Sequence, residues 1–575
     1  MKLETSKDIH KPEQLITEHI DIWTSAILAK STSGRGSSKK YELYGITKLR
    51  ELILELAVRG KLVPQDSDDE PASILLEKIA AEKAQLIKKK IIKKTKPLPL
   101  ISSEDKPYEL PVSWAWIRLG DTGISSTGKT PKTSETKFFN GDIPFIGPGQ
   151  ITTNNVILTP EKTLTEEGLE QSTEALEKDI MMVCIGGSIG KSAVVDRRIG
   201  FNQQINSIRP LLVNHKYLLF SLQAKDFYSR LISESTGSAT PIINRGKWDL
   251  LLIGLPPLAE QQRIVAKVDE LMLLCDQLEQ QTEASIDAHA TLVEVLLATL
   301  TDSGDADELA QNWSRISEHF DSLFTTEQSI EALKQTVLQL AVMGKLVPQN
   351  PDDEPASVLL EKIAEEKEQL IKEKRIRDNK SPAKNNEASL DCELPLGWTI
   401  SCFGDITFNR DPERVPLSVD VRRNRQGSYD YYGASGVIDK IDDFLFDKPL
   451  LLIGEDGANL VNRSTPIAFI ARGKYWVNNH AHVIDGINEA LLLYLSIYIN
   501  SISLKPYITG TAQPKMNQAK MNSILVMLPP LAEQHRIVTK VDELMAICDQ
   551  LKEKLQQSQE TQVQLTDALI DRALG

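Results

Sequence analysis

The sequence is poor in cysteine and in long apolar runs. No apolar run approaches the roughly 18 residues that a membrane-spanning helix needs, and the first residues lack the apolar core of a secretory signal. The five cysteines are odd in number and form no CxxC pair, so that neither a disulfide framework nor a zinc site is predicted: Cys184, Cys275, Cys392, Cys402 and Cys548. These absences predict a cytoplasmic protein that does not bind a membrane.

Positive charge is also scarce. The chain has 66 Lys and Arg against 80 Asp and Glu, which gives a net charge of −14. A DNA-binding protein usually contacts phosphates through Lys and Arg. The deficit is uneven, however, because residues 123–254 hold 14 basic against 13 acidic residues and residues 407–527 hold 13 against 12. Two nearly neutral segments in an acidic frame remain compatible with DNA binding if partner proteins supply part of the positive surface.

The chain contains a long internal repeat. Residues 56–90 recur at 340–374 with 28 identities in 35 positions, and residues 255–279 recur at 528–552 with 20 identities in 25. The 575 residues, of which 41% are hydrophobic, suffice for three or four domains. Between the repeated blocks lie two inserts, 123–254 and 407–527, that share little sequence. We infer that the frame performs one task twice, whereas the inserts perform different tasks.

The frame is predicted to be helical. Apolar residues after Pro257 alternate in steps of four and three, which predicts a heptad seam and a coiled coil of about 60 Å per helix; ordinary core packing is the alternative. The seam residues are Ile264, Val268, Leu271, Cys275 and Leu278, and Ile537, Val541, Leu544, Cys548, Leu551 and Leu555 in the second copy. Helices are also predicted at Pro12–Leu28, Leu49–Arg59, Ala72–Lys90, Leu333–Met343 and Ala356–Lys374, with Gly60 and Gly344 as C-caps.

The inserts alternate short strand-like and helical pieces, which predicts compact α+β domains. Strands are predicted at Ile180–Ile185, Ser192–Val195, Leu450–Ile453 and Pro466–Ile470, and helices at Lys216–Leu231 and Glu489–Ile502. One short motif survives in both inserts: Thr236-Gly237-Ser238-Ala239-Thr240-Pro241 with Asn244 matches Thr509-Gly510-Thr511-Ala512-Gln513-Pro514 with Asn517. This match suggests a common ancestral domain.

These motifs resemble those of a known family. The repeated LPPLAEQ-[QH]-RIV followed by KVDELM, the repeated ELP-x-x-W before each insert and the G-x-A-x-P-x-x-N at each insert's end are similar to the specificity subunits of type I restriction–modification enzymes. The resemblance covers essentially the whole chain. The repeated LAV-x-GKLVPQ suggests an IB-like subclass.

The resemblance implies a fold and a set of partners. It implies two α+β target-recognition domains separated by two long helices that form an antiparallel coiled coil with a pseudo-twofold repeat. Each domain would read one half of a split site in double-stranded DNA. The chain itself would be non-catalytic and hold no cofactor or metal. Two modification subunits would bring the S-adenosylmethionine-dependent methyltransferase, and motor–nuclease subunits would use ATP and Mg²⁺.

The resemblance and the repeat together divide the chain into six parts. We expect an N-terminal helical region at 1–108, the first recognition domain at 109–254, the first long helix at 255–300, a central helical region and linker at 301–392, the second recognition domain at 393–527 and the second long helix at 528–575. The stretches Lys88–Pro99 and Arg375–Ala388 are interpreted as solvated linkers, with DNA contact by their lysines as the less favoured reading.

Three segments imitate catalytic or metal-binding motifs. Residues 186–192, GGSIGKS, resemble a phosphate-binding P-loop but are one residue short of its spacing. Leu255-Pro256-Pro257-Leu258 lacks both the polar acceptor and the aromatic residue of amino-methyltransferases, so it is interpreted as the start of a helix. His480 and His482 have no third metal ligand nearby, which favours a strand with polar residues on one face.

The inserts supply polar side chains that suit DNA bases. Asn, Gln and Arg can bond bidentately to adenine or guanine edges, and Ser, Thr and Lys serve phosphates and bases. For each single residue an ordinary surface role remains the alternative. The candidates in the first insert are Gln150, Thr152, Asn154, Asn155, Lys191, Gln203, Gln204 and Ser238. Those in the second are Arg422, Arg423, Arg425, Gln426, Tyr429, Tyr431, Asn462, Arg463, Asn478, Asn479 and His480, with Asn424 and Tyr432 in the same cluster.

Two other functions remain open. The chain could itself be a methyltransferase or nuclease, although the motifs for either are missing. It could also be a coiled-coil scaffold whose inserts bind protein, which the charge balance permits.

Overall fold

The structure is a computed structural model that describes residues 12–29, 41–94, 96–237, 240–304, 306–376, 394–510 and 513–575. Residues group into two compact units, one formed by 1–285 with 558–575 and one formed by 286–557. Ser31–Lys40, Ser238 and most of the linker Arg375–Ala388 lie outside the described residues.

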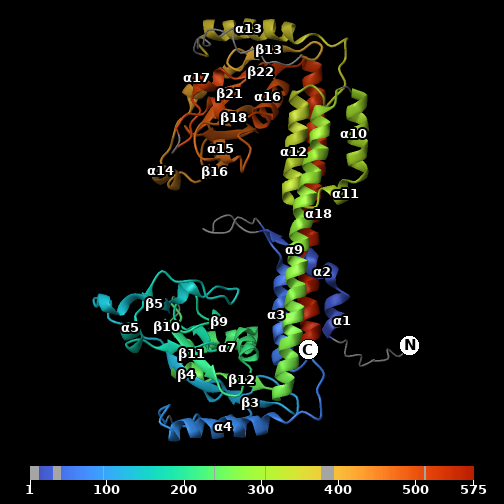
Figure 1. Cartoon of the computed structure of the whole chain (residues 1–575). Coiled ribbons are helices and arrows are strands. Elements are labelled where there is room, and N and C mark those ends of the chain that lie inside the picture. The colour runs from blue at the N-terminus through green and yellow to red at the C-terminus, as the bar shows by residue number, and fades with distance from the viewer. Residues whose placement is uncertain are drawn as a thin grey trace. The chain divides into compact units, whose positions relative to one another are not determined.

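In the first unit, three helices run side by side. α3 (Tyr44–Val58) lies between the first part of α9 (Leu258–Asp302) and the last part of α18 (Leu531–Leu574) (Figure 1). Contacts from α3 onward move backward along α9, from the Arg50–Asp276 pair to the Gln65–Glu260 pair. Along α18 they move forward, because Lys61, just after α3, reaches the carbonyl of Leu574 at the end of that helix. α3 is therefore antiparallel to α9 and parallel to α18. The unit also contains α1 (Pro12–Thr17), α2 (Ile20–Ser25) and the hairpin of β1 (Leu28–Ala29) and β2 (Tyr41–Glu42).

The second unit repeats this arrangement with the long helices exchanged. α12 (Glu327–Val342) contacts α18 through Lys334–Asp549 and contacts the end of α9 through Lys345 and the Thr301 carbonyl. α10 (Ala306–Glu318) and α11 (Phe320–Leu323) complete this part. In each unit α9 and α18 therefore run in opposite directions beside a shared frame helix, which confirms the predicted antiparallel pair.

The predicted seam is buried. Its residues Ile264, Val268 and Cys275 are fully covered, and Ile537 and Cys548 are covered to the same degree in the second copy. Helices α9 and α18 have 45 and 44 residues and lie within three residues of the long helices predicted at 255–300 and 528–575. Among the described residues α9 is long and apolar enough to cross a membrane by length and composition alone, which the sequence analysis did not anticipate.

One set of contacts ties the frame together in both units. The indole N–H of Trp114 donates to Glu260 at 2.9 Å, and Gln65 donates to the other oxygen of the same carboxylate at 2.6 Å. Burial raises the pKa of Glu260 above its usual value. The second unit repeats the triad with Trp398, Glu533 and Gln349 at 3.0 and 2.8 Å. The glycine C-caps are also confirmed, with φ of 68° at Gly60 and 70° at Gly344.

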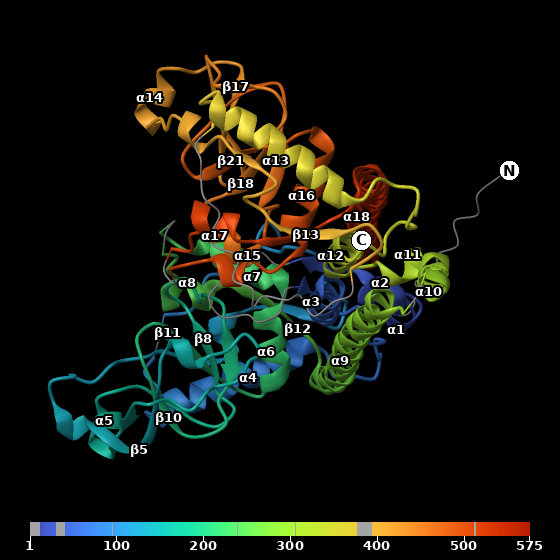
Figure 2. The ribbon, with the colours of Figure 1, turned by 90° about the horizontal axis from the view of Figure 1, so that it is seen from above.

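The first insert forms two four-stranded sheets closed by a separate strand pair. The sheets have the orders β6-β5-β10-β7 and β4-β11-β8-β9, and β3 pairs with β12. Figure 2 shows β5, β10 and α5 on the side of the domain away from α6. The elements are β3 (Ala115–Arg118), β4 (Gly123–Thr127), β5 (Phe139–Ile146), β6 (Thr163–Leu164), α5 (Glu166–Glu170), β7 (Glu174–Ala175), β8 (Ile180–Val183), β9 (Ser192–Val194), β10 (Ile199–Phe201), β11 (Ile205–Pro210), α6 (His215–Gln223), α7 (Lys225–Glu234), α8 (Arg245–Leu250) and β12 (Leu252–Leu255), with 3-10 turns η1 (Leu119–Asp121), η2 (Thr136–Phe138) and η3 (Pro148–Gln150).

The second insert has the same topology strand for strand. Its sheets have the orders β16-β15-β20-β17 and β14-β21-β18-β19, and β13 pairs with β22. The strands β5 and β10, like β15 and β20, pair in parallel. The elements are β13 (Thr399–Cys402), β14 (Phe408–Asn409), α14 (Val419–Arg423), β15 (Tyr429–Gly433), β16 (Gly436–Ile441), β17 (Phe446–Asp447), β18 (Leu450–Gly454), α15 (Asn459–Asn462), β19 (Ala468–Ala471), β20 (Lys474–Val477), β21 (Ala481–Asp485), α16 (Glu489–Ser501), α17 (Gln518–Asn522) and β22 (Leu525–Leu528), with 3-10 turns η4 (Asp411–Glu413) and η5 (Lys505–Tyr507).

Four predicted helices need correction. The helix predicted over Lys216–Leu231 is two helices, α6 and α7, because Ala224 leaves the helical region with ψ of 140° between them. The helix predicted over Pro12–Leu28 is likewise split into α1 and α2. The frame helices α4 (Ala72–Lys88) and α13 (Ala356–Lys372) end two residues earlier than predicted.

Candidate nucleic-acid interface

In the first insert, a short turn joins β10 to β11 across the two sheets. Asn202 shapes this turn, because its side-chain oxygen accepts the N–H of Gln204 at 3.0 Å and its own N–H donates to Ile146 at 3.0 Å. The Gln204 carbonyl in turn accepts the N–H of Cys184, which follows β8. The turn Asn202–Gln204 is thus fixed against the ends of both sheets, and it exposes Gln203.

In the second insert, Asn478–His480 forms the same turn. Asn478 accepts the N–H of His480 at 2.8 Å and donates its own N–H to Tyr432 at 3.0 Å. The His480 carbonyl accepts the N–H of Glu455, which follows β18. These shared bonds make Gln204 and His480 equivalent in the two folds. Candidates chosen separately in two inserts that share little sequence therefore occupy one structural position.

The motif shared by the inserts bonds to the loop that follows β8 or β18, which in turn bonds to the turn. Gly186 donates its N–H to the Pro241 carbonyl at 2.9 Å, and Gly457 donates to Pro514 at 3.0 Å. Gly237 and Gly510 have φ of +89° and +85°, and a Cβ on either would lie 2.6 Å from a backbone oxygen of the same loop. Such a conformation favours glycine.

The motif's asparagine has a separate structural role. Asn244 accepts the N–H of Lys247 and caps α8, and Asn517 accepts the N–H of Lys520 and caps α17. The motif residues are therefore shared because they build the loop. We call the surface formed by the turn, the described part of the motif loop and the loop after β8 or β18 the reading edge. Its described residues are 202–204, 236–237, 240–241 and 184–191 in the first insert, and 478–480, 509–510, 513–514 and 455–460 in the second.

The two reading edges carry different chemistry at equivalent positions. In the first, Ile185 faces Ile242 across an isolated bridge; in the second, Asp456 faces Lys515 across the same bridge. The Asp456 carboxylate is 2.9 Å from Nδ1 of His480, an exposed ring. The first reading edge thus places apolar side chains beside amides, whereas the second reading edge places charged side chains at the same positions. Edges that differ in this way would recognise different ligands.

Beneath the second edge lies a buried ionic cluster around His482. Its Nδ1 is 2.7 Å from Asp411 and its Nε2 is 2.9 Å from the Met516 carbonyl, so both nitrogens face acceptors. Burial lowers the pKa of His482, but its hydrogen bond and charge interaction with Asp411 outweigh burial and raise the pKa overall. Arg414 bonds Glu455 at 2.9 Å and lies 3.5 Å from Asp411. The doubly bonded ring is therefore an imidazolium that holds β21 to η4.

Other candidates of the first insert lie close to its turn. Gln150 accepts the Gly147 N–H at 3.0 Å, and a Cβ on Gly147 would lie 3.3 Å from the Asn202 amide. The loop that follows exposes Asn154 and Asn155, the latter with φ of 63°, while Thr152 bonds Val156. Lys191 is half-buried beside the turn after β8. Of these candidates, Gln150 is the one that printed contacts place beside the turn, through Gly147.

The candidates of the second insert are more scattered. Several are held in internal contacts: Arg422 bonds Asp439, Arg425 bonds Asp442, Gln426 bonds the Arg422 carbonyl, Tyr429 packs on Phe444, Arg463 donates to the carbonyls of Asn500 and Ile502, and Tyr431 is fully buried. Asn478 is also buried, where it shapes the turn. Arg423, Asn462, Asn479 and His480 remain exposed.

The sequence analysis missed several residues of the reading edges. Thr130 donates to the Gln203 side chain at 2.7 Å, and Asn202, Asp456 and Lys515 shape or charge the edges. One signal was present in the sequence. Asn202 stands two residues before Gln204, and Asn478 stands two residues before His480, in each case just ahead of the next strand. The likeness is too short to stand out without the topology.

A duplicated frame that carries two domains of one topology and different edge chemistry defines a modular recognition protein with two unlike reading modules. The chain matches the Type I restriction modification DNA specificity domain over residues 111–288 and 395–560. It belongs to this family of specificity subunits of type I restriction–modification systems.

Relatives of full length support this membership. The chain is 40% identical to the Type I restriction enzyme EcoAI specificity subunit of Escherichia coli, covering 98% of this chain and 100% of the relative. It is also 40% identical to the EcoEI specificity subunit of Escherichia coli, with the same coverage. A solved structure from work on complex assembly and conformational transition of the type I R-M system covers 81% of this chain and 99% of its own, with a TM-score of 0.50 at 16% identity. That structure supports the fold.

Proposed function

We propose that this chain reads an asymmetric, two-part site in double-stranded DNA, with one reading edge on each half-site. The observation that carries the proposal is the equivalence of Gln204 and His480 within one topology, flanked by Ile185 and Ile242 in one edge but by Asp456 and Lys515 in the other. One scaffold with exchanged edge residues would dock on DNA in one way and read different bases. The two half-sites should therefore differ in sequence.

The side chains at the edges suit base recognition. Amides bond bidentately to adenine in the major groove, and a histidine can donate to guanine or accept from an exocyclic amine. In the first domain we assign contact to Gln150, Thr152, Asn154, Asn155, Lys191, Gln203 and Gln204; in the second we assign it to Arg423, Asn462, Asn479 and His480. The remaining candidates with internal contacts are assigned to shaping the domain.

The chain is proposed to act without catalysis of its own. Modification subunits, two per chain, would supply the S-adenosylmethionine-dependent methyltransferase, and motor–nuclease subunits would supply ATP-driven restriction, all in the cytoplasm. The net charge of −14 supports this division, because the positive surface for DNA phosphates must come largely from partners. Each mismatched base pair would cost about 1–3 kcal/mol of binding free energy.

The test is sequencing of adenine methylation in a host that carries the complete system. Gln203→Ala with Gln204→Ala should relax one half of the methylated motif and leave the other unchanged, and exchange of residues 123–254 for another family insert should replace that half. Gln171→Ala, an exposed glutamine after α5, is the matched control and should leave the motif intact. A change in both halves, or in neither, would contradict the assignment.

The same system separates the alternatives. Methyl transfer or DNA cleavage by the purified chain alone would make it an enzyme. Unchanged DNA binding by the variant with Gln203→Ala and Gln204→Ala, combined with unaltered methylation when both inserts are exchanged, would make the chain a protein scaffold.

A further inference from the structure

The position shared by Gln204 and His480 presents opposite hydrogen-bonding groups in the two reading edges. Each of these side chains already bonds to a neighbour in its own domain. In both cases that neighbour can take only one role in the bond, as donor or as acceptor. The group that each side chain has left to offer is therefore determined before any ligand binds.

In the first reading edge, a backbone N–H fixes the amide of Gln204. This N–H can only donate, and it donates to the side-chain oxygen of Asn202 at 3.0 Å. The other end of the Asn202 amide is consequently its NH2 group, which donates to the side-chain oxygen of Gln204 at 3.3 Å. The group left on Gln204 is its own NH2, which can only donate and for which the described residues provide no acceptor.

In the second reading edge, a carboxylate fixes the ring of His480. The two oxygens of Asp456 lie 2.9 and 3.0 Å from Nδ1, and an ionised carboxylate can only accept. Nδ1 therefore carries a proton, and in the neutral ring Nε2 is an acceptor. The side chain of His480 is 49% exposed, and no contact with a described residue engages Nε2.

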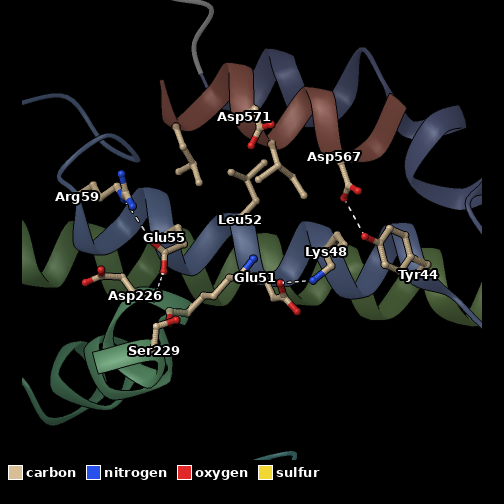
Figure 3. A pocket seen from close by; sticks show the side chains of 13 residues that line it. Tyr44, Lys48, Glu51, Leu52, Glu55, Arg59, Asp226, Ser229, Asp567 and Asp571 are labelled. Carbon is tan, nitrogen blue, oxygen red and sulfur yellow. Dashed lines mark hydrogen bonds and ion pairs between the residues drawn. The ribbon is translucent and has the colours of Figure 1, made fainter. Parts of the chain in front are cut away.

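The backbone of the first reading edge is held by the frame. The carboxylate of Glu55 in α3 accepts the N–H of Asp226, at the start of α7, at 2.8 Å (Figure 3). Tyr228 of α7 lies against the loop after β8, because a Cβ on Gly190 would be 2.6 Å from its ring. The first residue of that loop donates its N–H to the Gln204 carbonyl. A side chain on a backbone held in this way loses less conformational entropy when it binds.

The second reading edge is held by charged groups. Nζ of Lys515 lies 3.1 Å from Glu455, whose N–H donates to the His480 carbonyl at 2.8 Å. Lys515 also pairs with Asp456 across the isolated bridge. His482, below the edge, is buried and bonded at both ring nitrogens. Of these titratable groups around the His480 ring, Asp456 is the one in contact with Nδ1.

We propose that this shared position reads a keto base (guanine or thymine) in one half-site and an amino base (adenine or cytosine) in the other; this rests on the proposed function. The NH2 group of Gln204 donates to guanine O6 or thymine O4, and Nε2 of His480 accepts from adenine N6 or cytosine N4. Asp456 is a positioning residue, because it touches no base but selects the tautomer of His480. Protonation of the ring turns Nε2 into a donor, so in acid the second edge alone changes to keto bases.

The experiment is competition titration of the assembled complex with duplexes that carry the methylated motif. In each half-site, one base pair at a time is exchanged between the keto and the amino base, and the ratio of the two affinities is measured at pH 8.5 and at pH 6. This ratio cancels general effects of pH on folding and binding. At one base pair of the second half-site, the unchanged chain should prefer the amino base roughly tenfold at pH 8.5 and lose or reverse this preference at pH 6. The first half-site should keep its preferences.

Three variants separate the hydrogen-bonding role from the shape of the side chain. Gln204→Glu keeps an oxygen for Asn202 but replaces the donor by an acceptor, so one base pair of the first half-site should shift roughly tenfold from the keto to the amino base. His480→Gln should keep the amino preference without its pH dependence, because Asp456 accepts from the amide NH2 and leaves the amide oxygen free. Asp456→Asn can donate to Nδ1 or accept from it, so discrimination at that base pair should fall although the ring is retained.

Two matched controls change charge without changing these bonds. Gln171→Glu alters an exposed glutamine after α5, and Lys515→Gln removes the charge beside Asp456 but leaves the partner of Nδ1 in place. Both should keep the base preferences of the unchanged chain. A control that shifts them as strongly as Gln204→Glu or Asp456→Asn would overturn the proposal.

The remaining outcomes are also distinct. An equal ratio at pH 6 and pH 8.5 at every base pair of the second half-site overturns the assignment of His480. Unaltered preferences in Gln204→Glu overturn that of Gln204. Urea unfolding identifies a variant that fails to fold, and the comparison of the two pH values needs no variant. If the unchanged complex binds the motif and a scrambled duplex equally, the proposed function fails instead.

Discussion

The imidazole of His482 lies 2.7 Å from the carboxylate of Asp411, and its other nitrogen faces the Met516 carbonyl at 2.9 Å. Glu455 lies 3.8 Å from the same ring nitrogen, Arg414 lies 3.5 Å from Asp411, and β21 carries the ring between β14 and β18. In the first domain the equivalent residue of β11 is Asn206, which accepts from Thr127 at 2.9 Å. The same position is thus an ion pair in one domain and a neutral pair in the other, which predicts a pH response in only one of them.

We predict that the second domain loses stability as pH rises above 6.5, the ordinary pKa of histidine. The pKa of His482 is raised in the folded state from an ordinary value of 6.5, so its contribution is fully present below pH 6.5 and is lost as pH rises through the folded-state pKa. The pKa of Asp411 is lowered, since His482 and Arg414 outweigh its burial, so its contribution is lost only in acid.

The measurement is urea unfolding of the full chain between pH 6 and 9. His482→Gln should flatten the alkaline decline, whereas His535→Gln, an exposed histidine of α18, should leave it unchanged. An equally steep decline in His482→Gln would show that another group controls it.

Trp114→Phe should destabilise the first unit by about 1–3 kcal/mol, because it leaves the buried carboxylate of Glu260 with one donor fewer. The pKa of Glu260, already raised by burial, should rise further. Trp398→Phe should do the same to the second unit through Glu533.

Chemical unfolding monitored by fluorescence gives the free energy of each variant. Trp116→Phe, a half-buried indole of β3 that packs on Tyr108, is the control and should cost less. Equal costs for Trp114 and Trp116 would mean that ring packing, and not the bond to Glu260, stabilises the frame.

Gly237→Ala and Gly510→Ala should each destabilise their domain by about 1–2 kcal/mol and weaken binding of the matching half-site. Both glycines have positive φ, and a Cβ would lie 2.6 Å from a backbone oxygen, so the motif loop must shift. Gly149→Ala is the control, because a Cβ there meets nothing within 4 Å. Thermal unfolding and DNA titration of the assembled complex measure the two effects; unchanged behaviour of both glycine variants would show that the loop is not needed.

The helices of the frame could be predicted from the sequence because heptad spacing and glycine C-caps are local signals. The seam from Ile264 to Leu278 and the caps Gly60 and Gly344 are confirmed for this reason. In the sequence, only the motif at the end of each insert indicated that the inserts share a topology. The strands that pair lie far apart in the sequence, and their side chains differ between the two inserts. Arg422 and Tyr431 were predicted to contact DNA because of their residue types. In the structure Arg422 bonds Asp439, 17 residues away in the sequence, and Tyr431 is buried in the sheet core. Partners so distant in sequence cannot be inferred from composition.

The turn asparagines give the sharpest prediction about recognition. Asn202→Ala removes the bond from the Gln204 N–H and a 3.3 Å bond to the Gln204 side chain, and Asn478→Ala removes the bond from the His480 N–H, a net loss of about 0.5–1.5 kcal/mol per bond. The side chains of Gln203 and Gln204, or of Asn479 and His480, would then be less ordered before binding. We expect a loss of roughly threefold to tenfold in DNA affinity, confined to discrimination within one half-site.

Titration of the assembled complex with DNA changed in either half-site measures this effect. Asn478→Asp keeps the accepting oxygen and should restore much of the discrimination, which a general loss of folding would not allow. If Asn478→Ala weakens discrimination in both half-sites equally, the two turns do not act as independent readers, and the equivalence of Gln204 and His480 would reflect only shared ancestry.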